Sequence, residues 1–332
     1  MRVMVLGGTG LLGHETVRVL LERGHEVTLL ARHSPPQSLT ALRDLPVVIA
    51  DAVTTQPDEF AHLLSGFDAA VYAMGPDDRT THEGEADAFF ETHLVGATER
   101  LVEGARLAGV GQVVLMGSYF TTWARMRPDL DLAAHHPYVR ARLAQSARAF
   151  AAGGGRAAGG TDVMVLEIPY VFGSIPGQVP HWKRLLFDVV RKGPVALFLD
   201  GGTSVVSSRQ VGEAAVGALE HGSHGGQYPL ADVDWTYHEL ATRIRSALGK
   251  SRLVVDVPGW LVAPGVKLLG RRWGMTGQSA GLDPSHIVPD ILSQQIYVDG
   301  AGSRAVLGWT PGGVPEALID TLRASYPEAT IR

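Results

Sequence analysis

The sequence predicts an α/β fold built on a doubly wound parallel sheet, with a smaller C-terminal lobe. Three observations predict it. Short apolar strands alternate with helices through the first half of the chain, four glycines follow the first strand within seven residues, and the alternation loosens after residue 172. Short apolar runs separated by helices are typical of a parallel sheet that is covered on both faces.

The order of the elements supports this fold. Residues 11–24 and 89–109 have the apolar spacing of amphipathic helices. The first strand, the first helix and the second strand together have the length of one βαβ unit. Six segments are predicted as strands: residues 2–8, 25–32, 45–51, 68–75, 111–118 and 162–169.

A glycine motif lies between the first strand and the first helix. Gly7, Gly10 and Gly13 have the spacing G-x-x-G-x-x-G. One glycine permits the tight turn, the next lets a pyrophosphate approach the backbone, and the third lets the helix pack closely on the strand. The N–H groups and the dipole at the helix N-terminus also favour phosphate. The motif therefore predicts a dinucleotide-binding Rossmann domain.

We expect this domain to span residues 1–172, with residues 203–232 returning to it. The substrate-binding lobe is then formed by residues 173–202 and 233–332, where Pro and Trp become frequent.

Composition narrows the function classes. The chain has 332 residues, 45% of them apolar, a formal net charge of −5 and no cysteine. The charge argues against a general nucleic-acid binder, and the lack of cysteine excludes disulfides, thiol catalysis and cysteine-ligated metal. Without a predicted signal peptide or membrane span, we expect a cytoplasmic protein with no membrane partner. No spacing of His, Asp and Glu resembles a helix-borne ligand pair, so we expect no bound metal.

The end of the second predicted strand indicates which dinucleotide binds. An acidic residue there would accept a hydrogen bond from a ribose 2′-hydroxyl, but the sequence has Arg32 followed by His33. A cation at this point suits the 2′-phosphate of NADP, so NADP is the predicted cofactor and NAD the alternative. Asp51, after the third strand, is predicted to accept a hydrogen bond from the adenine amine.

Two later stretches carry a family resemblance. Ser118 ends the fifth strand, and Tyr138 precedes Arg142 by four residues. Together with the glycine motif, the segment 168–173 and the late segment 307–311, they make the chain similar to the extended short-chain dehydrogenase/reductases, the NAD(P)-dependent epimerase/dehydratase group. The dihydroflavonol-reductase-like branch is the nearest in appearance.

The resemblance implies the catalytic roles. Tyr138 would be the general acid/base, Ser118 would hydrogen-bond the substrate oxygen, and Arg142 would replace the family lysine. An unperturbed tyrosine has a pKa of about 10, so lowering it by about three units requires about 4 kcal/mol, much of which a neighbouring cation can supply. Arginine carries that charge, but it stays protonated and is a poor proton relay.

The resemblance also implies the surroundings of the cofactor and the substrate. The residues expected around the cofactor are Gly7, Thr9, Gly10, Leu11, Leu12, Gly13, Arg32, Asp51, Ala52, Ala73, Met74, Tyr138, Arg142, Pro169 and Val171. Those expected near the substrate are Tyr119, Phe120, His93, Tyr170 and Trp182.

The sequence departs from the family at several of its usual positions. His93 stands where the family usually has an asparagine, and packing is the favoured interpretation for it. Glu167 stands in a strand and needs a partner, for which Arg142 is one candidate. His135 and His136, just before Tyr138, are expected to be solvated.

The lobe lacks the polar anchors of sugar-nucleotide enzymes. Tyr170 stands at the usual asparagine position and Ser204 where an arginine would be expected, although Lys183 and Arg184 could compensate. The aromatic residues in this part of the chain suit an apolar or aromatic small molecule instead.

Three functions remain open. The favoured one is an NADP-dependent oxidoreductase that transfers hydride between nicotinamide and a carbonyl or alcohol. The second is an NAD-dependent sugar-nucleotide epimerase or dehydratase, and the third is a catalytically decayed regulatory protein that senses the dinucleotide. A homodimer is usual in the family.

Overall fold

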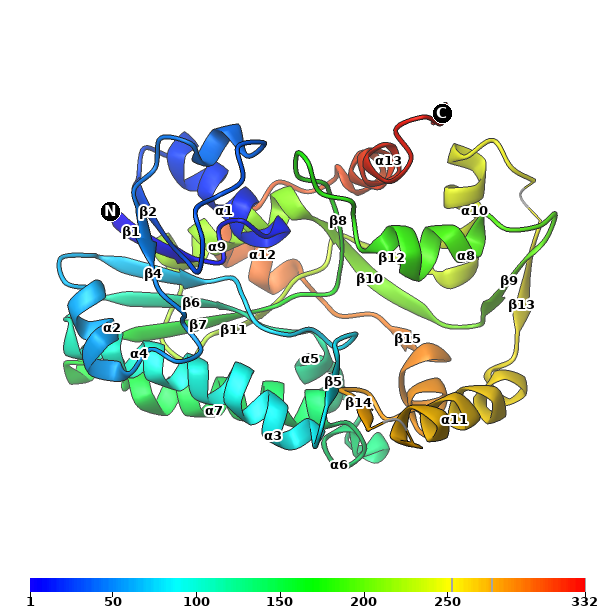
Figure 1. The fold of residues 1–332 in the computed structure, drawn as a ribbon, viewed down its shortest axis with the longest axis horizontal. Helices are drawn as coiled ribbons and strands as arrows, with labels where there is room; N and C mark the ends of the chain where they lie inside the picture. Colours follow the sequence, from blue (N-terminus) through cyan, green and yellow to red (C-terminus); the bar gives the residue numbers. More distant parts are fainter. Residues whose placement is uncertain (252, 276, 332) are drawn as a thin grey trace.

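The computed structural model describes residues 1–251, 253–275 and 277–331. Its larger sheet has seven parallel strands in the order β11-β7-β6-β4-β1-β2-β3 (Figure 1). The strands are β1 (Arg2–Leu6), β2 (Glu26–Ala31), β3 (Val47–Ile49), β4 (Ala69–Tyr72), β6 (Gln112–Met116), β7 (Asp162–Glu167) and β11 (Gln227–Pro229). This arrangement confirms the predicted α/β fold.

Helices cover both faces of the sheet, which is why its strands are continuously apolar. In β1, Val3 and Val5 belong to the core on one face, whereas Met4 and Leu6 belong to the core on the other. The helices on the first face are α1 (Leu11–Glu22), α9 (Ser208–His221) and α12 (Ala301–Leu307). Those on the second face are α2 (Pro57–Leu63), α4 (Ala97–Leu107) and α7 (Pro137–Gly153).

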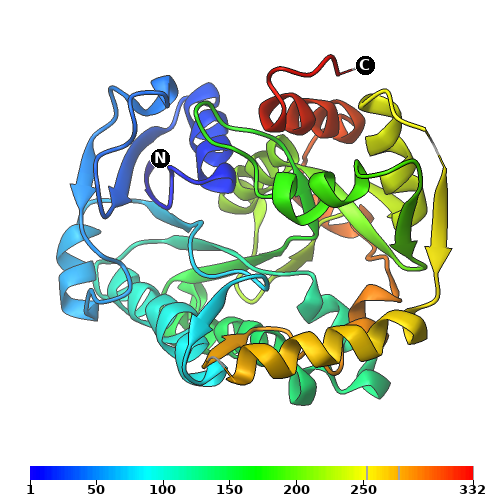
Figure 2. The same ribbon diagram turned by 45° about the vertical axis from the view of Figure 1, so that its right-hand side comes forward.

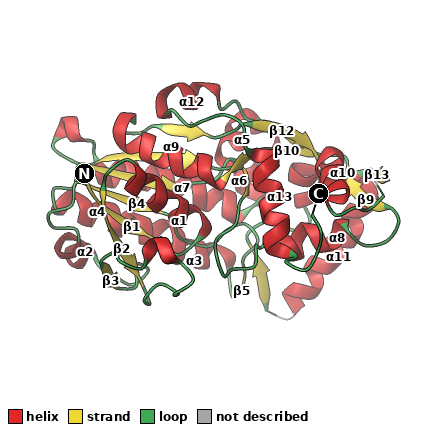
Figure 3. Cartoon of the chain, turned by 90° about the horizontal axis from the view of Figure 1, so that it is seen from above, coloured by secondary structure: helices red, strands yellow, loops and turns green. Residues whose placement is uncertain are grey.

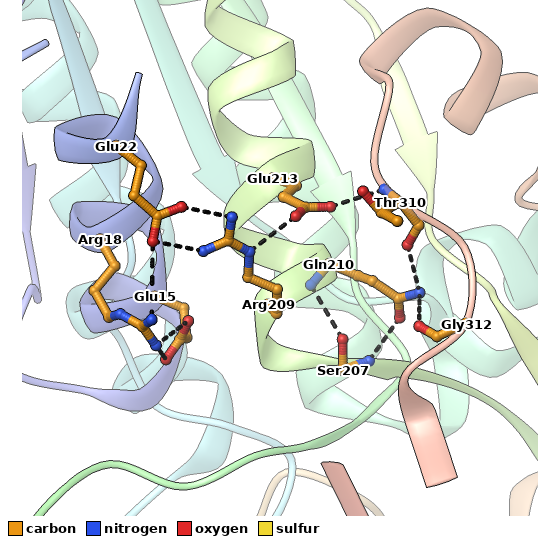
Figure 4. Close-up of polar contacts among 9 residues, drawn as sticks. All are labelled: Glu15, Arg18, Glu22, Ser207, Arg209, Gln210, Glu213, Thr310 and Gly312. Atoms are coloured by element: carbon orange, nitrogen blue, oxygen red, sulfur yellow. Dashed lines mark hydrogen bonds and ion pairs between the residues drawn. The ribbon is translucent and has the colours of Figure 1, made fainter. Parts of the chain in front are cut away.

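Charged side chains connect α1 with α9 across the surface of the first face. Arg209 bonds Glu22 at 2.6 Å and Glu213 at 2.8 Å, and the other Glu213 oxygen accepts a hydrogen bond from the Thr310 N–H (Figure 4). Partly exposed pairs of this kind contribute only a few tenths of a kcal/mol each, roughly 0.2–1. The Glu213 contact also ties the C-terminal segment to α9.

The second lobe lies beside the sheet (Figure 3) and has its own apolar core. One small sheet contains β8 (Tyr170–Phe172), β10 (Gly202–Ser207), β12 (Val233–Thr236) and β15 (Gln295–Ile296). A separate pair is formed by β9 (Ala196–Leu199) and β13 (Val254–Val257). The lobe helices are α8 (Asp188–Val190), α10 (Tyr237–Ala247), α11 (Gly259–Met275) and α13 (Val314–Ser325).

Short elements join the two parts. Strand β5 (Thr81–Glu83), which follows β4 in the chain, pairs antiparallel with β14 (Gln278–Ala280), which follows α11. Helix α11 consequently runs along the front of the molecule from the lobe back toward the large sheet (Figure 2). The remaining helical pieces are α3 (Ala86–Phe90), α5 (Phe120–Met126), α6 (Leu132–His135), the π-helical turns η2 (Glu91–Gly96), η5 (Lys183–Phe187) and η6 (Val288–Leu292), and the 3-10 turns η1 (Thr40–Leu42), η3 (Pro128–Leu130) and η4 (Arg156–Ala158).

Candidate active site

A cavity of about 770 Å³ lies at the carboxyl ends of the large-sheet strands. Gly10 of the glycine loop, Ala73 after β4, Ser118 after β6 and Pro169 after β7 all line it. Ligands of open α/β sheets bind at this edge because the loops that leave the strands converge there. The cavity continues into the lobe, whose aliphatic and aromatic side chains form its far wall.

The glycine loop has the geometry that a dinucleotide requires. Gly7 has φ +85°, and a Cβ there would lie 2.4 Å from the Ala73 carbonyl oxygen. A Cβ at Gly13 would lie 2.2 Å from the Gly7 carbonyl oxygen, so helix and loop touch at this point. A Cβ at Gly10 would meet only the Gly7 oxygen, at 3.5 Å, and Gly10 caps α1 without a side-chain hydrogen bond. The first turn of α1 is therefore accessible to a phosphate.

The predicted catalytic side chains lie together. The Arg142 Nε donates a hydrogen bond to the Tyr138 hydroxyl at 2.9 Å, and the Arg142 Nη1 donates to the Met116 carbonyl at 3.0 Å. Tyr138 begins α7 directly after Pro137, which places Arg142 one helical turn further along the same face. Ser118, Tyr138 and Arg142 are all buried and line the cavity.

The environment of Tyr138 favours the neutral phenol. Burial raises its pKa above the ordinary value, and the nearby Asp78 carboxylate acts in the same direction. Arg142 and a hydrogen bond with Ser118 lower the pKa, but burial outweighs them. The phenol therefore keeps its proton at neutral pH and is suited to donating it.

Gln145 supports Arg142 from the next turn of α7, a role that the sequence reasoning missed. Its Oε1 accepts a hydrogen bond from the Arg142 Nη1 at 2.9 Å, and its Nε2 donates to the Thr98 hydroxyl at 2.8 Å. The spacing of three residues after the cation was the available signal. This chain of hydrogen bonds fixes the guanidinium against Tyr138.

The loop after β4 brings acidic and basic groups into the cavity, and it was also missed. Asp77, Asp78 and Arg79 all line the cavity. Desolvation raises the pKa of the Asp78 carboxyl, and Asp77 adds to this effect. The Arg79 guanidinium lies 5.1 Å from the centre of the Trp182 ring, so this loop contacts the lobe. The charged run at a strand end was the signal that could have found it.

Several predicted residues line the cavity as expected. From the cofactor set these are Gly10, Leu11, Leu12, Ala73, Met74, Tyr138, Arg142, Pro169 and Val171, and from the substrate set Tyr119, Phe120, Tyr170 and Trp182. The Tyr170 and Trp182 rings pack against each other, and the Trp182 Nε1 donates to the Val171 carbonyl at 2.7 Å. The lobe wall is therefore ordered by aromatic contacts.

Other predicted residues lie outside the cavity wall. Arg32 is exposed directly after β2, Asp51 accepts a local hydrogen bond from the Val53 N–H at 2.9 Å, and Ala52 is buried in the core. The Thr9 carbonyl accepts a hydrogen bond from Gln178. The cofactor roles of these residues stay predictions.

His93 packs, as the favoured interpretation had it. The His93 ring stacks on Phe89 with 4.4 Å between ring centres, and its Nδ1 lies 2.9 Å from the Phe89 carbonyl oxygen. His93 belongs to the π-helical turn η2 and does not line the cavity.

The expectation that His135 and His136 are solvated was wrong for His136, whereas His135 is partly exposed. His136 is fully buried, and its Nδ1 accepts a hydrogen bond from the Asp283 N–H at 3.0 Å. The His135 Nδ1 lies 2.7 Å from the Asp290 carboxylate. Both histidines join the start of α7 to the lobe segment 283–290, a contact between distant parts of the chain that the local sequence does not reveal.

The partner of Glu167 is not Arg142. Glu167 is fully buried and accepts hydrogen bonds from the Thr121 hydroxyl and the Arg125 Nη2, each at 2.6 Å. Helix α5 therefore neutralises this carboxylate and leaves Arg142 for Tyr138. Ser204 is likewise structural, since its hydroxyl donates to Asp234 and accepts from the Val298 N–H.

Comparisons with known proteins agree with this geometry. Residues 7–152 match the NAD(P)H-binding family model. This match covers less than half of the chain and identifies its first part as NAD(P)H-binding. The chain resembles, at 26% identity, the 2-alkyl-3-oxoalkanoate reductase of Stenotrophomonas maltophilia, over 62% of this chain and 60% of that protein.

Two further similar proteins are informative. A 3-beta-hydroxysteroid dehydrogenase of Mycolicibacterium neoaurum is 33% identical over 35% of this chain and 32% of its own length. The solved structure of a nucleoside-diphosphate-sugar epimerase from Pseudomonas aeruginosa superposes with a TM-score of 0.72 at 19% identity, covering 100% of this chain and 99% of that one. The structural likeness establishes the fold, and the chain spans less than two thirds of the length of these curated relatives.

Proposed function

We propose that the protein is an NADP-dependent reductase or dehydrogenase that interconverts a carbonyl and an alcohol on an apolar or aromatic small molecule. The observation that carries this proposal is one cavity that joins the glycine loop, the Tyr138–Arg142–Ser118 group and the apolar lobe wall. The names of the two curated relatives, an oxoalkanoate reductase and a hydroxysteroid dehydrogenase, support the same reaction class and an apolar substrate.

Tyr138 is the proposed proton donor. As a neutral phenol it gives its proton to the substrate oxygen, while Ser118 donates a second hydrogen bond to that oxygen. The Arg142 Nε, 2.9 Å away, then stabilises the phenolate that remains. When bound, the nicotinamide supplies or accepts the hydride.

The cofactor fits the residues that are present. The N-terminus of α1 and the uncrowded Gly10 would hold the pyrophosphate, and Ala73 and Val171 border the cavity between the glycine loop and Tyr138. Arg32, exposed after β2, is proposed to bind the 2′-phosphate of NADP.

The lobe wall supports an apolar substrate. Leu186, Phe198 and Leu240 line the cavity beside the aromatic residues already named. Lys183 bonds Asp188 at 3.3 Å and lies over the Tyr326 ring, which directs it toward α13 instead of toward a diphosphate in the cavity. These contacts disfavour the sugar-nucleotide alternative.

A titration tests the proposal. Purified protein is titrated with NADPH and with NADH, bound cofactor is analysed in the untreated sample, and carbonyl compounds of increasing apolar size are then screened for NADPH oxidation. We expect exchangeable NADPH binding that is tighter than NADH binding, and Arg32→Ala should weaken only the former. The matched control is Arg43→Ala, another exposed arginine of the same domain.

The other outcomes are distinct. Tightly held NAD with no carbonyl reduction would favour the epimerase or dehydratase alternative. Binding of cofactor without turnover of any carbonyl would favour the regulatory alternative, and equal losses of NADPH and NADH binding in Arg32→Ala would contradict the 2′-phosphate role.

A further inference from the structure

Helix α11 presents several large apolar side chains to the outside of the molecule, with Arg271 among them. Trp260 is 73% exposed, Leu268 is 53% exposed and Met275 is 80% exposed. Spacings of eight and seven residues place these side chains on one face of a helix, and Leu261, 54% exposed, lies beside them. A soluble protein rarely gathers large apolar side chains in this way without a use for them.

The opposite face of α11 points toward the rest of the molecule, although Leu269 on it is still 47% exposed. Val266 and Leu269 line the candidate active-site cavity, and Gly270 lies so close to Pro284 that a Cβ there would be 2.4 Å from it. Strand β14, directly after α11, is held by β5. The helix is therefore fixed on the molecule by its inner face, and the outward apolar face is not left over from poor packing of the whole element.

The charges on α11 indicate what covers the outward face. The helix carries Lys267, Arg271 and Arg272, all exposed, and no acidic residue, although the whole chain has a net charge of −5. On the helical wheel Lys267 and Arg272 border the apolar face, and Arg271 lies within it between Trp260 and Met275. An apolar face that contains tryptophan and leucine and is bordered by cations is the pattern of helices that lie in the interface of an anionic bilayer.

The apolar surface extends beyond the helix. Strand β13 leads into α11, and its Val255 pairs with Leu197 of β9; both side chains are exposed, at 45% and 65%. In the part of the chain that the structure describes, no helix is both long enough and apolar enough to cross a bilayer.

We propose that α11 docks the protein on the surface of an anionic lipid bilayer, with Trp260, Leu268 and Met275 in the headgroup region and the three cations against lipid phosphates. This proposal replaces the sequence-based expectation of no membrane partner, which rested on the lack of a spanning segment. If the proposed function holds, the inner face of the same helix would also bring the cavity close to apolar substrates dissolved in the bilayer, but the docking does not depend on it.

Vesicle co-sedimentation tests the docking. The full-length protein is mixed with vesicles of phosphatidylcholine alone and of phosphatidylcholine with phosphatidylglycerol, at low and high salt. We expect binding to the anionic vesicles that weakens with salt, since each cation near the surface contributes about fivefold to the partition. Lys267→Glu with Arg271→Glu should weaken binding more than tenfold, on the order of that contribution squared.

Matched variants separate the apolar contribution from general surface effects. Trp260→Ser with Leu268→Ser should abolish vesicle binding, whereas Val306→Ser, a 44% exposed apolar residue on α12, should leave it unchanged. Arg323→Glu on α13 is the control for the charge reversals. Circular dichroism and NADPH binding confirm that each variant is folded.

A spectroscopic readout places the helix. Vesicles with brominated acyl chains should quench tryptophan fluorescence in the wild type, and Trp260→Phe should remove that part of the quenching while retaining vesicle binding. Two results would overturn the proposal. In the first, the folded protein binds neither kind of vesicle. In the second, the protein also binds no vesicles but associates with itself, and Trp260→Ser with Leu268→Ser abolishes that self-association. The second result would assign the face to a contact between copies of this chain.

Discussion

The two parts of the molecule use similar apolar strands in opposite ways. In β1, Val3 to Leu6 are completely buried, because helices lie on both faces of the seven-stranded sheet. In the β9–β13 pair, Leu197 and Val255 face outward, since only one side of the pair is covered by α10. The same residue types therefore form a core where two layers meet and a surface where one layer is missing.

The helices differ in the same manner. Helix α1 packs Val17, Val19 and Leu20 against the sheet and has Arg18 and Glu22 outside. Helix α11 has apolar residues on both its inner and outer faces. The strands of the sheet half are thus covered on both faces, whereas the lobe has apolar side chains both toward the cavity and toward the outside.

The largest expected effect is a difference in kcat between a variant of the sheet half and a variant of the lobe. Tyr138→Phe removes the proposed proton donor of the sheet half and should lower kcat by about 10²–10⁴-fold. Tyr237→Phe, which removes a hydroxyl from the cavity wall in the lobe, should change kcat less than about tenfold, because a positioning contact contributes roughly 0.5–1.5 kcal/mol. Steady-state kinetics with NADPH measure both variants.

The cofactor affinity of Tyr138→Phe is the control. An unchanged Kd for NADPH shows that only the acid was lost, while an active Tyr138→Phe protein would remove the proposed mechanism. Because burial raises the pKa of Tyr138, alcohol oxidation, which needs the phenolate, should increase with pH to above about 10.

A matched pair of leucines tests the packing comparison directly. Leu6→Ala in β1 should lower the free energy of unfolding by about 2–5 kcal/mol, since the side chain is completely buried. Leu197→Ala in β9 should change it by less than about 0.5 kcal/mol, since that side chain is 65% exposed. Urea denaturation followed by fluorescence gives both values, and equal losses would contradict the comparison.

The contact between the two parts should be sensitive to acid. Burial lowers the pKa of His136 to about 4 despite Asp290 and Asp283 nearby, with His135 and His286 adding to the lowering. Between about pH 6.5 and pH 4 the unfolded chain binds a proton here that the folded protein does not, so stability falls as the pH falls, by at most about 3 kcal/mol.

His136→Asn checks this dependence. The Asn side-chain oxygen can still accept the hydrogen bond from the Asp283 N–H but does not titrate. The melting temperature of the variant should therefore decline less than that of the wild type between pH 6.5 and pH 4. A decline of equal steepness would show that His136 is not the group responsible.

The smallest expected effect lies in α11. A Cβ at Gly265 would meet no atom within 4 Å, so Gly265→Ala should stabilise the protein by up to about 1 kcal/mol through helix propensity alone. Thermal unfolding measures the change. A clear destabilisation would show that the exposed side of α11 is packed in solution. The apolar surface of the lobe would then be covered, as the strands of the sheet half are.

The sequence predicted the sheet half better than the lobe. The strands, the glycine loop and the Tyr138–Arg142 spacing are local patterns, and each corresponds to one turn or one strand of the structure. Ala52 and His93 were placed by resemblance, and they lie away from the cavity because their side chains pack against neighbours from other elements.

What the sequence by itself determined is the order of strands and helices, the turn at Gly7 and the pair Tyr138–Arg142, because each depends on residues that are close in the chain. Only the tertiary structure decided the partner of Glu167, the burial of His136 and the outward face of α11. Those features depend on which distant segments remove water from a side chain, and burial of that kind is set by packing between elements, not by the neighbours of a residue in the sequence.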